Sequence, residues 1–283
     1  MIKATQLSFT YPGQAQPAVN DISFEVAPGE IFGFLGPSGA GKSTTQKILI
    51  RLLGNYQGTV SINRQELSSL NNDFYNQIGV GFELPNHYPR LTALENLRFF
   101  QAFYRNRSTN LMELLEMVGL HDHAHKPTTE FSKGMKMRLN FIRALVHDPD
   151  ILFFDEPTSG LDPVNARKLK DIILQLRQKG KTIFLTTHNM HDAEELCQRV
   201  AFIAQGKISL IDSPKNLKLQ YGTRKLTLEY GNGQLICREF PLDNLGENAE
   251  FLNLIRSQHI HSIHSAEASL EEVFIQTTGQ KLT

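Results

Sequence analysis

Gly36-Pro-Ser-Gly-Ala-Gly-Lys-Ser43 decides the fold of this 283-residue chain. The stretch fits the pattern G-x-x-x-x-G-K-[S/T], follows the short apolar run 31–35, and precedes residues 44–53, which we expect to be helical. A strand, a glycine loop and a helix start in this order direct backbone N–H groups and the positive end of a helix dipole at one anion. The stretch therefore predicts a phosphate-binding loop in an α/β fold.

The residues of this loop have separate expected roles. Gly36, Gly39 and Gly41 permit backbone dihedrals that side chains would hinder, so several amides can converge on a β-phosphate. Lys42 is expected to reach the β- and γ-phosphates of ATP, and the Ser43 hydroxyl to ligate Mg²⁺. A plain glycine turn before a helix is the alternative, and the flanking strand and helix disfavour it. The other expected nucleotide contacts in the loop are Pro37, Ser38, Ala40 and Thr44.

A second apolar run, residues 151–154, ends in the two carboxylates Asp155 and Glu156, and Pro157 follows. The carboxyl end of a buried strand is where α/β sheets place their chemistry. We assign Asp155 to Mg²⁺ and Glu156 to polarising the attacking water. Two solvated carboxylates at a strand end are the alternative, which the phosphate loop upstream makes unattractive.

A third string, Phe131-Ser-Lys-Gly-Met135, resembles the signature loop L-S-G-G-Q of the nucleotide-binding subunits of ABC transporters. Further matches occur in family order over about residues 1–220. The resemblance implies that Ser132 and Gly134 contact the γ-phosphate of ATP held by a second copy, because they should lie too far from their own phosphate loop. It therefore implies a head-to-tail dimer, which we expect to pair identical copies.

The resemblance also assigns single residues. It implies that Tyr11 stacks on adenine, that Asp162 in 159–162 belongs to a loop crossing the dimer interface, and that His188 contacts the γ-phosphate. Without the family match, Tyr11 would be taken for an edge-strand aromatic and His188 for a surface histidine. Together with Glu156 and Lys42, His188 completes the expected catalytic set.

Two parts of the chain depart from the family pattern. Glu83 stands where the family generally has Gln, and the resemblance implies that its carboxylate ligates Mg²⁺, with more negative charge beside the phosphates than an amide brings. In the signature string, Lys133 replaces the first Gly and Met135 replaces Gln, whereas Ser132 and Gly134 are retained.

The expected fold is a P-loop NTPase core with an antiparallel β subdomain and an inserted α-helical subdomain, followed by a small α+β domain. Residues 2–9 and 18–26 alternate like antiparallel strands, and an α-helical subdomain is expected at about 84–147. We assign 1–220 to the ABC ATPase domain and 221–283 to a C-terminal accessory domain. The stretch 269–274 resembles the tail found in the drug and antibiotic exporter branch of the family.

Composition restricts the partners of the chain. Lys plus Arg and Asp plus Glu number 29 each, so no basic field predicts nucleic-acid binding. No apolar run approaches the roughly 18 residues of a membrane span, and the N-terminus does not resemble a signal peptide. We therefore expect a cytoplasmic protein that lies on the inner face of the membrane through a separate transmembrane permease.

The predicted function is ATP binding and hydrolysis that power export through that permease. Residues 83–91 mix aromatic residues and prolines, and we expect this stretch to contact the permease; a plain connection is the alternative. A soluble ABC ATPase that remodels a non-membrane target is the rival class, but such chains usually carry two cassettes or a long coiled-coil insertion, and this sequence shows neither. A relay that binds ATP without hydrolysing it would require loss of Glu156 or His188, and both residues are present.

Overall fold

The computed structural model describes residues 1–222, 225–231, 235–266 and 268–280. These residues form two compact units: the first is Met1–Asp212, and the second begins at Ser213. Each unit has its own sheets and its own hydrophobic cluster, so the two are described separately below.

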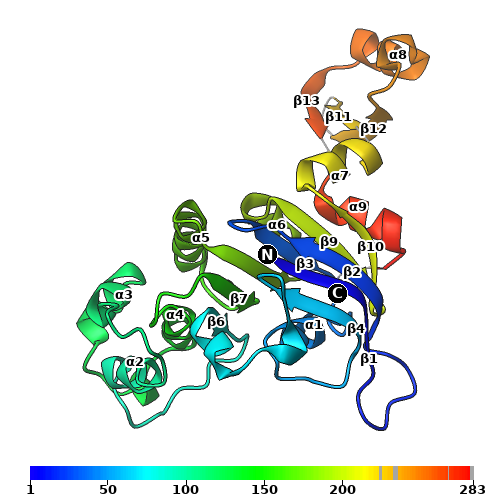
Figure 1. Cartoon of the computed structure of the whole chain (residues 1–283). Helices are drawn as coiled ribbons and strands as arrows, with labels where there is room; N and C mark the ends of the chain where they lie inside the picture. The colour runs from blue at the N-terminus through cyan, green and yellow to red at the C-terminus, as the bar shows by residue number, and fades with distance from the viewer. Residues whose placement is uncertain (223–224, 232–234, 267, 281–283) are drawn as a thin grey trace. The chain divides into compact units, whose positions relative to one another are not determined.

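A six-stranded sheet forms the centre of the first unit (Figure 1). Its strand order is β10-β9-β3-β8-β7-β6; the contacts among β9, β3, β8, β7 and β6 are parallel, and β10 pairs with β9 as an antiparallel hairpin. Residues of β3, β7 and β8 are buried along their whole length, as expected of strands covered on both faces. The strands are β3 (Ile31–Leu35), β6 (Ile78–Gly81), β7 (Ile151–Asp155), β8 (Thr182–Thr187), β9 (Arg199–Ala204) and β10 (Lys207–Asp212).

A second, antiparallel sheet has the order β2-β1-β4-β5. Aromatic side chains link it to the central sheet: Phe24 of β2 lies 5.4 Å from Phe34 of β3 and 6.0 Å from Phe184 of β8, ring centre to ring centre. This shared core fixes the carboxyl end of β3, where the phosphate loop starts. The strands are β1 (Ile2–Phe9), β2 (Val19–Val26), β4 (Gln57–Ile62) and β5 (Gln65–Glu66).

Three helices, α2 (Ala93–Gln101), α3 (Leu111–Met117) and α4 (Lys133–Arg143), pack on one another at one side of the first unit (Figure 1). The Thr92 side chain accepts the Glu95 N–H, and the Glu95 carboxylate accepts the Thr92 N–H, so a capping box begins α2. Short 3₁₀ turns connect these elements at Leu67–Ser69, Asn72–Asn76, His121–His123 and Thr128–Glu130.

The remaining helices of the first unit follow the strands that end near the phosphate loop. Helix α1 (Lys42–Leu49) follows β3, α5 (Pro163–Gln178) follows β7, and α6 (Met190–Leu196) follows β8. The second unit has the strand order β12-β11-β13, and α8 lies over Leu226, Leu228 and Phe240 through Phe251. Its elements are α7 (Pro214–Tyr221), β11 (Lys225–Tyr230), β12 (Ile236–Pro241), a 3₁₀ turn (Leu245–Glu247), α8 (Ala249–Ser257), β13 (Ile260–Ala266) and α9 (Leu270–Thr278).

The element predictions differ from the structure at a few points. The helix expected over 44–53 is displaced, since α1 runs from Lys42 to Leu49. The chain then forms a turn in which the Leu52 N–H donates to Lys47 O. Gln205 and Gly206, both at positive φ, form the tight turn between β9 and β10. We predicted neither α6, α7 nor β13; the polar composition of β13, with its His and Ser residues, weakens the strand pattern.

Candidate nucleotide-binding site

The phosphate loop joins β3 to α1 and lacks room for side chains at two of its glycines. A Cβ on Gly36 would lie 2.1 Å from the Ile203 carbonyl oxygen, and one on Gly41 would lie 2.5 Å from the Ala18 carbonyl oxygen. Gly39 and Gly41 also have positive φ angles of 80° and 109°. These glycines are therefore required by the close approach of backbone and by the loop's own turns.

Lys42 lies at the start of α1 and folds back over the loop. Its ammonium donates hydrogen bonds to the carbonyl oxygens of Gly36 at 2.6 Å and Pro37 at 3.0 Å. Burial lowers the pKa of Lys42, and the negative charges of Glu156, Asp155 and Glu83 oppose that shift. The ammonium is thus a buried cation beside the cavity in which phosphates would lie.

A cavity of about 290 Å³ lies beside this loop. It is lined by loop residues 38–39 and 41–44, and also by Glu83, Asp155, Glu156 and His188, so the structure brings together residues that the sequence separates by up to 150 positions. We call this cavity the phosphate cleft. Among the described residues that line it, one lysine faces three carboxylates, which favours a polyphosphate accompanied by a divalent cation over a polyphosphate alone.

Asp155 and Ser43 both line the phosphate cleft and contact each other there. The Ser43 hydroxyl donates to Asp155 Oδ1 at 3.4 Å, and the buried Thr186 hydroxyl at the end of β8 donates to the same oxygen. The Ser43 hydroxyl and the Asp155 carboxylate are both hard oxygen ligands, and the Glu83 carboxylate lines the same cleft. This donor set fits Mg²⁺.

Glu156 has an unusual backbone and a fixed carboxylate. Its φ angle is 49°, in the left-handed region that residues other than glycine seldom adopt. The Thr187 hydroxyl donates to Oε2 at 2.9 Å, whereas the backbone N–H and the ring Nδ1 of His188 donate to Oε1 at 2.9 Å and 2.7 Å. The end of β8 therefore sets the direction of the carboxylate at the end of β7.

Tyr11 lies next to the cleft, and its hydroxyl is 3.2 Å from the Thr44 hydroxyl oxygen. Ser132, Gly134 and Asp162 are absent from the described lining of the cleft. Ser132 caps α4 and Asp162 caps α5. Their two loops adjoin one another, since a Cβ on Gly134 would lie 3.5 Å from Leu161 Cδ2.

The sequence did not predict the threonines whose hydroxyls donate hydrogen bonds to the carboxylates in and around this site. Thr186 and Thr187 support the two carboxylates, and the Thr158 hydroxyl bonds to Asp192 at 2.7 Å. The threonines directly precede His188, which was the only available signal. Thr158 lies two residues after Glu156, but nothing in the sequence indicates that it meets a residue on α6.

The fold and this site define a P-loop ATPase. A family described as "ABC transporter" matches residues 19–159, and "Fluoroquinolone efflux ABC transporter C-terminal domain" matches residues 224–267. The chain is 52% identical to a fluoroquinolones export ATP-binding protein of Mycobacterium tuberculosis over 285 residues, covering 100% of this chain and 95% of that protein. The chain therefore belongs to the ATP-binding proteins of the ABC transporter family.

Other relatives and solved structures agree with this assignment. A Nod factor export ATP-binding protein of Paraburkholderia xenovorans is 34% identical, with 93% of each chain covered. A dimeric ATP-binding cassette bound to ADP and Pi superposes with a TM-score of 0.69 at 28% identity, covering 75% of this chain and 98% of that one.

These findings confirm several predictions. The P-loop NTPase fold is confirmed, as are ATP binding and ATP hydrolysis by a subunit of the exporter type. The rival class, a soluble ATPase that remodels a non-membrane target, is not favoured. Among the described residues, no helix has both the length and the apolar composition needed to cross a bilayer.

Proposed function

We propose that the chain uses ATP hydrolysis to drive export of drug-like molecules through a separate permease, with fluoroquinolones as the first cargo to test. One observation carries the choice of cargo: identity of 52% to the mycobacterial fluoroquinolones export protein extends over the whole chain. The match of residues 224–267 to the fluoroquinolone efflux C-terminal domain supports it independently of the ATPase motifs.

In the proposed mechanism, the phosphate loop and Lys42 hold the phosphates, and Tyr11 stacks on the adenine. Ser43, Asp155 and Glu83 would hold Mg²⁺, which supplies positive charge to offset the phosphate oxygens when it is bound. Glu156 accepts a proton from the attacking water. Its carboxylate is buried and fixed by Thr187 and His188, so little reorganisation is needed to orient the water.

His188 has a second role in this proposal. In the structure, its Nδ1 donates to Glu156 Oε1 at 2.7 Å, and with a proton on Nε2 as well the ring can donate a second hydrogen bond to an anionic oxygen. We infer that this oxygen belongs to the γ-phosphate of ATP. The contact would join the phosphate to the residue that orients the water.

Two copies of the chain are proposed to bury two ATP molecules between them. Support comes from the phosphate cleft, whose described lining contains neither Ser132, Gly134 nor Asp162. A partner copy would bring these residues over the γ-phosphate. The dimeric cassettes among the solved structures support the same arrangement.

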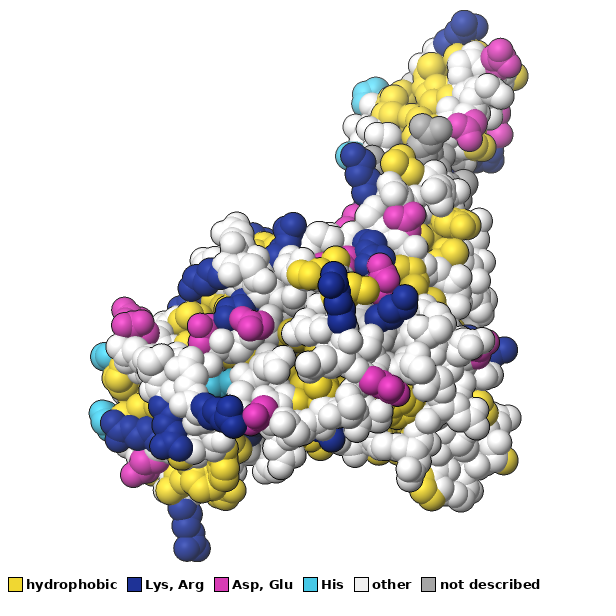
Figure 2. Space-filling view, viewed as in Figure 1, with side chains coloured by type: hydrophobic (Ala, Val, Ile, Leu, Met, Phe, Trp, Pro, Cys, Tyr) yellow, Lys and Arg dark blue, Asp and Glu magenta, His cyan; other side chains and the backbone are white. Residues whose placement is uncertain are grey.

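The permease is proposed to contact the stretch 83–91 beside an apolar hollow of about 470 Å³. Tyr88 is 47% exposed there, and its ring lies 4.6 Å from that of Phe99, which in turn lies 5.1 Å from that of Phe103. Hydrophobic side chains gather on the surface over α2, with Lys and Arg beside them (Figure 2). Residues lining the hollow include Ile50, Val80, Phe82, Tyr88, Phe100 and Arg143.

A pull-down from gently solubilised membranes tests this proposal, with the chain as bait. We expect recovery of a protein with several apolar spans of about 20 residues each, together with lower fluoroquinolone accumulation in cells that carry both proteins. This result would also support a cytoplasmic location on the inner face of the membrane. Recovery of ribosomes or nucleic acid instead, or unchanged fluoroquinolone accumulation, would contradict it.

A further inference from the structure

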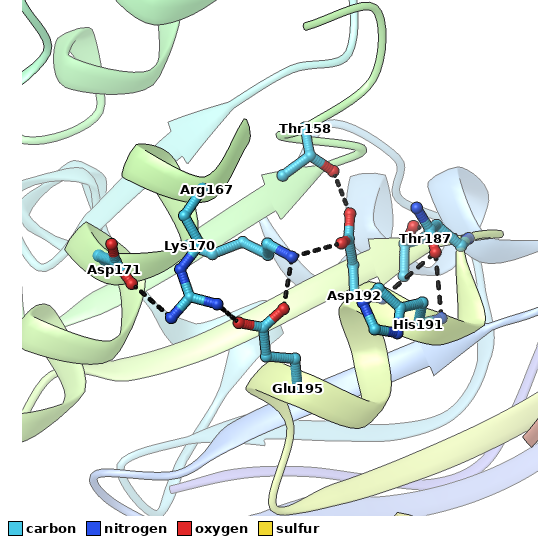
Figure 3. A network of polar contacts seen from close by, with 9 residues as sticks. Thr158, Arg167, Lys170, Asp171, Thr187, His191, Asp192 and Glu195 are labelled. Atoms are coloured by element: carbon cyan, nitrogen blue, oxygen red, sulfur yellow. Dashed lines mark hydrogen bonds and ion pairs between the residues drawn. The ribbon is translucent and has the colours of Figure 1, made fainter. Parts of the chain in front are cut away.

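Lys170 of α5 is a buried cation that the proposed mechanism does not use. Its side chain is 10% exposed, and its ammonium contacts Asp192 Oδ1 at 3.2 Å and also Glu195, both on α6 (Figure 3). Burial acts to lower the pKa of Lys170, but its hydrogen bonds to Glu195 and Asp192 outweigh burial and raise it. A lysine is seldom buried in this way unless it is paired with carboxylates. We therefore ask what the contact between Lys170 and Asp192 holds in place.

Asp192 connects this lysine to the segment that follows Glu156. Its Oδ1 contacts the ammonium, and its Oδ2 accepts the Thr158 hydroxyl hydrogen at 2.7 Å (Figure 3). The segment also turns on itself: Ser159 N–H donates to Glu156 O at 3.1 Å, and Leu161 N–H donates to Thr158 O at 3.2 Å. Thr158 is therefore the point at which α6 restrains the turn between Glu156 and Asp162.

Asp192 is also linked by hydrogen bonds to Thr187 at the end of β8. Asn189 accepts the backbone N–H of Asp192 at 3.2 Å, and the Asn189 N–H donates to the Thr187 hydroxyl at 2.9 Å. Thr187 in turn donates to Glu156 Oε2. Hydrogen bonds thus run from Thr158, two residues after Glu156, through Asp192, Asn189 and Thr187 to the Glu156 carboxylate.

We propose that Lys170 and Asp192 are positioning residues for ATP hydrolysis, which fix Thr158 and through it the backbone of Glu156 and of the loop 159–162. The inference rests on the proposed role of Glu156. The left-handed backbone of Glu156 persists only where its surroundings hold it, because this conformation is unfavourable for residues other than glycine. Lys170 orients the Asp192 carboxylate, and Asp192 holds Thr158.

Positioning through this pathway affects the rate of hydrolysis and leaves the phosphate loop unchanged. Neither Lys170, Asp192 nor Thr158 is among the described residues that line the phosphate cleft. Loss of the restraint should displace the carboxylate of Glu156 relative to the attacking water. A displacement of 1 Å can lower a rate by about a hundredfold.

The test compares four variants in single-turnover ATP hydrolysis, with ATP affinity and melting temperature measured on each. Thr158→Val and Lys170→Met should lower the rate about tenfold, with ATP Kd within about twofold of the parent. Thr158→Ser retains the hydroxyl and should restore most of the rate. Lys181→Met is the matched control: Lys181 is 12% exposed and pairs with Asp148 and Asp150, which do not bond to the turn after Glu156.

A double variant that combines Thr158→Val with Lys170→Met tests the pathway more strictly than the single variants. If Lys170 acts through Thr158, Thr158→Val with Lys170→Met should hydrolyse ATP no more slowly than the slower single variant. A multiplicative loss of rate would contradict the pathway. If Lys170→Met melts too early to be measured, the contrast between Thr158→Val and Thr158→Ser decides.

Failure of this inference differs from failure of the proposed function. Parental rates in both Thr158→Val and Lys170→Met, alongside a Glu156→Gln variant that no longer turns over, would overturn the positioning role alone. A Glu156→Gln variant with the parental rate would overturn the role of Glu156 and, with it, this inference. A weaker ATP Kd that accounts for the slower rate of Thr158→Val would also contradict positioning.

Discussion

The phosphate cleft and the apolar hollow lie in the same unit but are built in opposite ways. The cleft, about 290 Å³, is made from one continuous loop, three carboxylates and a histidine at or near strand ends. The hollow, about 470 Å³, is lined by side chains from separated stretches between Ile50 and Ala144. The cleft uses fixed charge and backbone for one small polyanion, whereas the hollow offers aromatic surface suited to another polypeptide.

The largest effect is expected from removing the general base, Glu156, from the phosphate cleft. Glu156→Gln should lower ATP turnover by about 10³-fold, because a buried amide cannot accept the proton of the attacking water. ATP should still bind, so the variant should accumulate as an ATP-bound dimer. Steady-state phosphate release and size-exclusion chromatography with ATP measure both effects.

The control for this variant is Glu116→Gln, at an exposed position on α3. It should hydrolyse ATP at the parental rate. Parental turnover by Glu156→Gln would instead show that another group orients the water.

The next largest effect should come from Lys42, which lines the cleft. Lys42→Ala removes the ammonium expected to contact the β- and γ-phosphates, and should weaken ATP binding by about 2–3 kcal/mol, or about a hundredfold. Titration calorimetry with ATP and Mg²⁺ measures the affinity. Lys47→Ala removes the same charge from an exposed position on α1 and should retain the parental Kd for ATP. An equal loss of ATP affinity in both variants would mean that the net charge of the protein, and not a direct contact of Lys42, sets the affinity.

The contrast also explains how much could be predicted from the sequence. Gly36 to Ser43 form a local motif whose backbone conformation follows from its own residues, so the loop and the strand and helix around it were predictable. Asp155 and Glu156 followed from the end of an apolar run. The family resemblance, and not residue chemistry, singled out Tyr11, Ser132 and His188.

Residues that depend on contacts between distant segments were not predictable. Thr158 meets Asp192 across 34 positions, and Asn140 donates to the Phe82 carbonyl oxygen across 58. Hydrophobic periodicity indicates that a residue is buried but not which residue it meets. The left-handed backbone of Glu156 was missed for the same reason, since non-glycine residues give no local signal of it.

Acid should affect the hollow through His87, which lines it. Nε2 of this ring bonds to Lys136 O at 2.9 Å, and the buried Nδ1 has no hydrogen-bond partner among the described residues. Burial lowers the pKa of His87 from 6.5 to about 4, and the positive charges of Arg143 and Lys136 act in the same direction. The folded protein therefore resists protonation of this ring.

The sign of the pH dependence follows from this shift. Between pH 6.5 and 4 the unfolded chain binds more protons at His87 than the folded chain, so the stabilisation present above pH 6.5 is lost as the pH falls. From pH 7 to pH 5 the free energy of unfolding should fall by about 1–2 kcal/mol on this account. Urea unfolding at both pH values measures it, and His87→Gln should reduce the difference; an unchanged difference would exclude His87 as its source.

The smallest expected change in ATP hydrolysis comes from the surface of the hollow, and it separates the two regions most directly. Tyr88→Ala removes a half-exposed ring whose backbone stays held by Asn96, which accepts the Tyr88 N–H at 2.8 Å and donates to its carbonyl oxygen at 3.1 Å. ATP hydrolysis by the isolated chain should therefore stay within about twofold of the parent, because the cleft is untouched. Export measured with the permease should fall about tenfold, as expected when one aromatic contact of about 1–2 kcal/mol is lost from an interface. Leu219→Ala is the control: this side chain on α7 is 65% exposed and is not among the described residues that line the hollow, so its loss should leave export close to the parental level. Equal loss of ATP hydrolysis and export in Tyr88→Ala would mean that the hollow supports the cleft, and would contradict a separate role in contacting the permease.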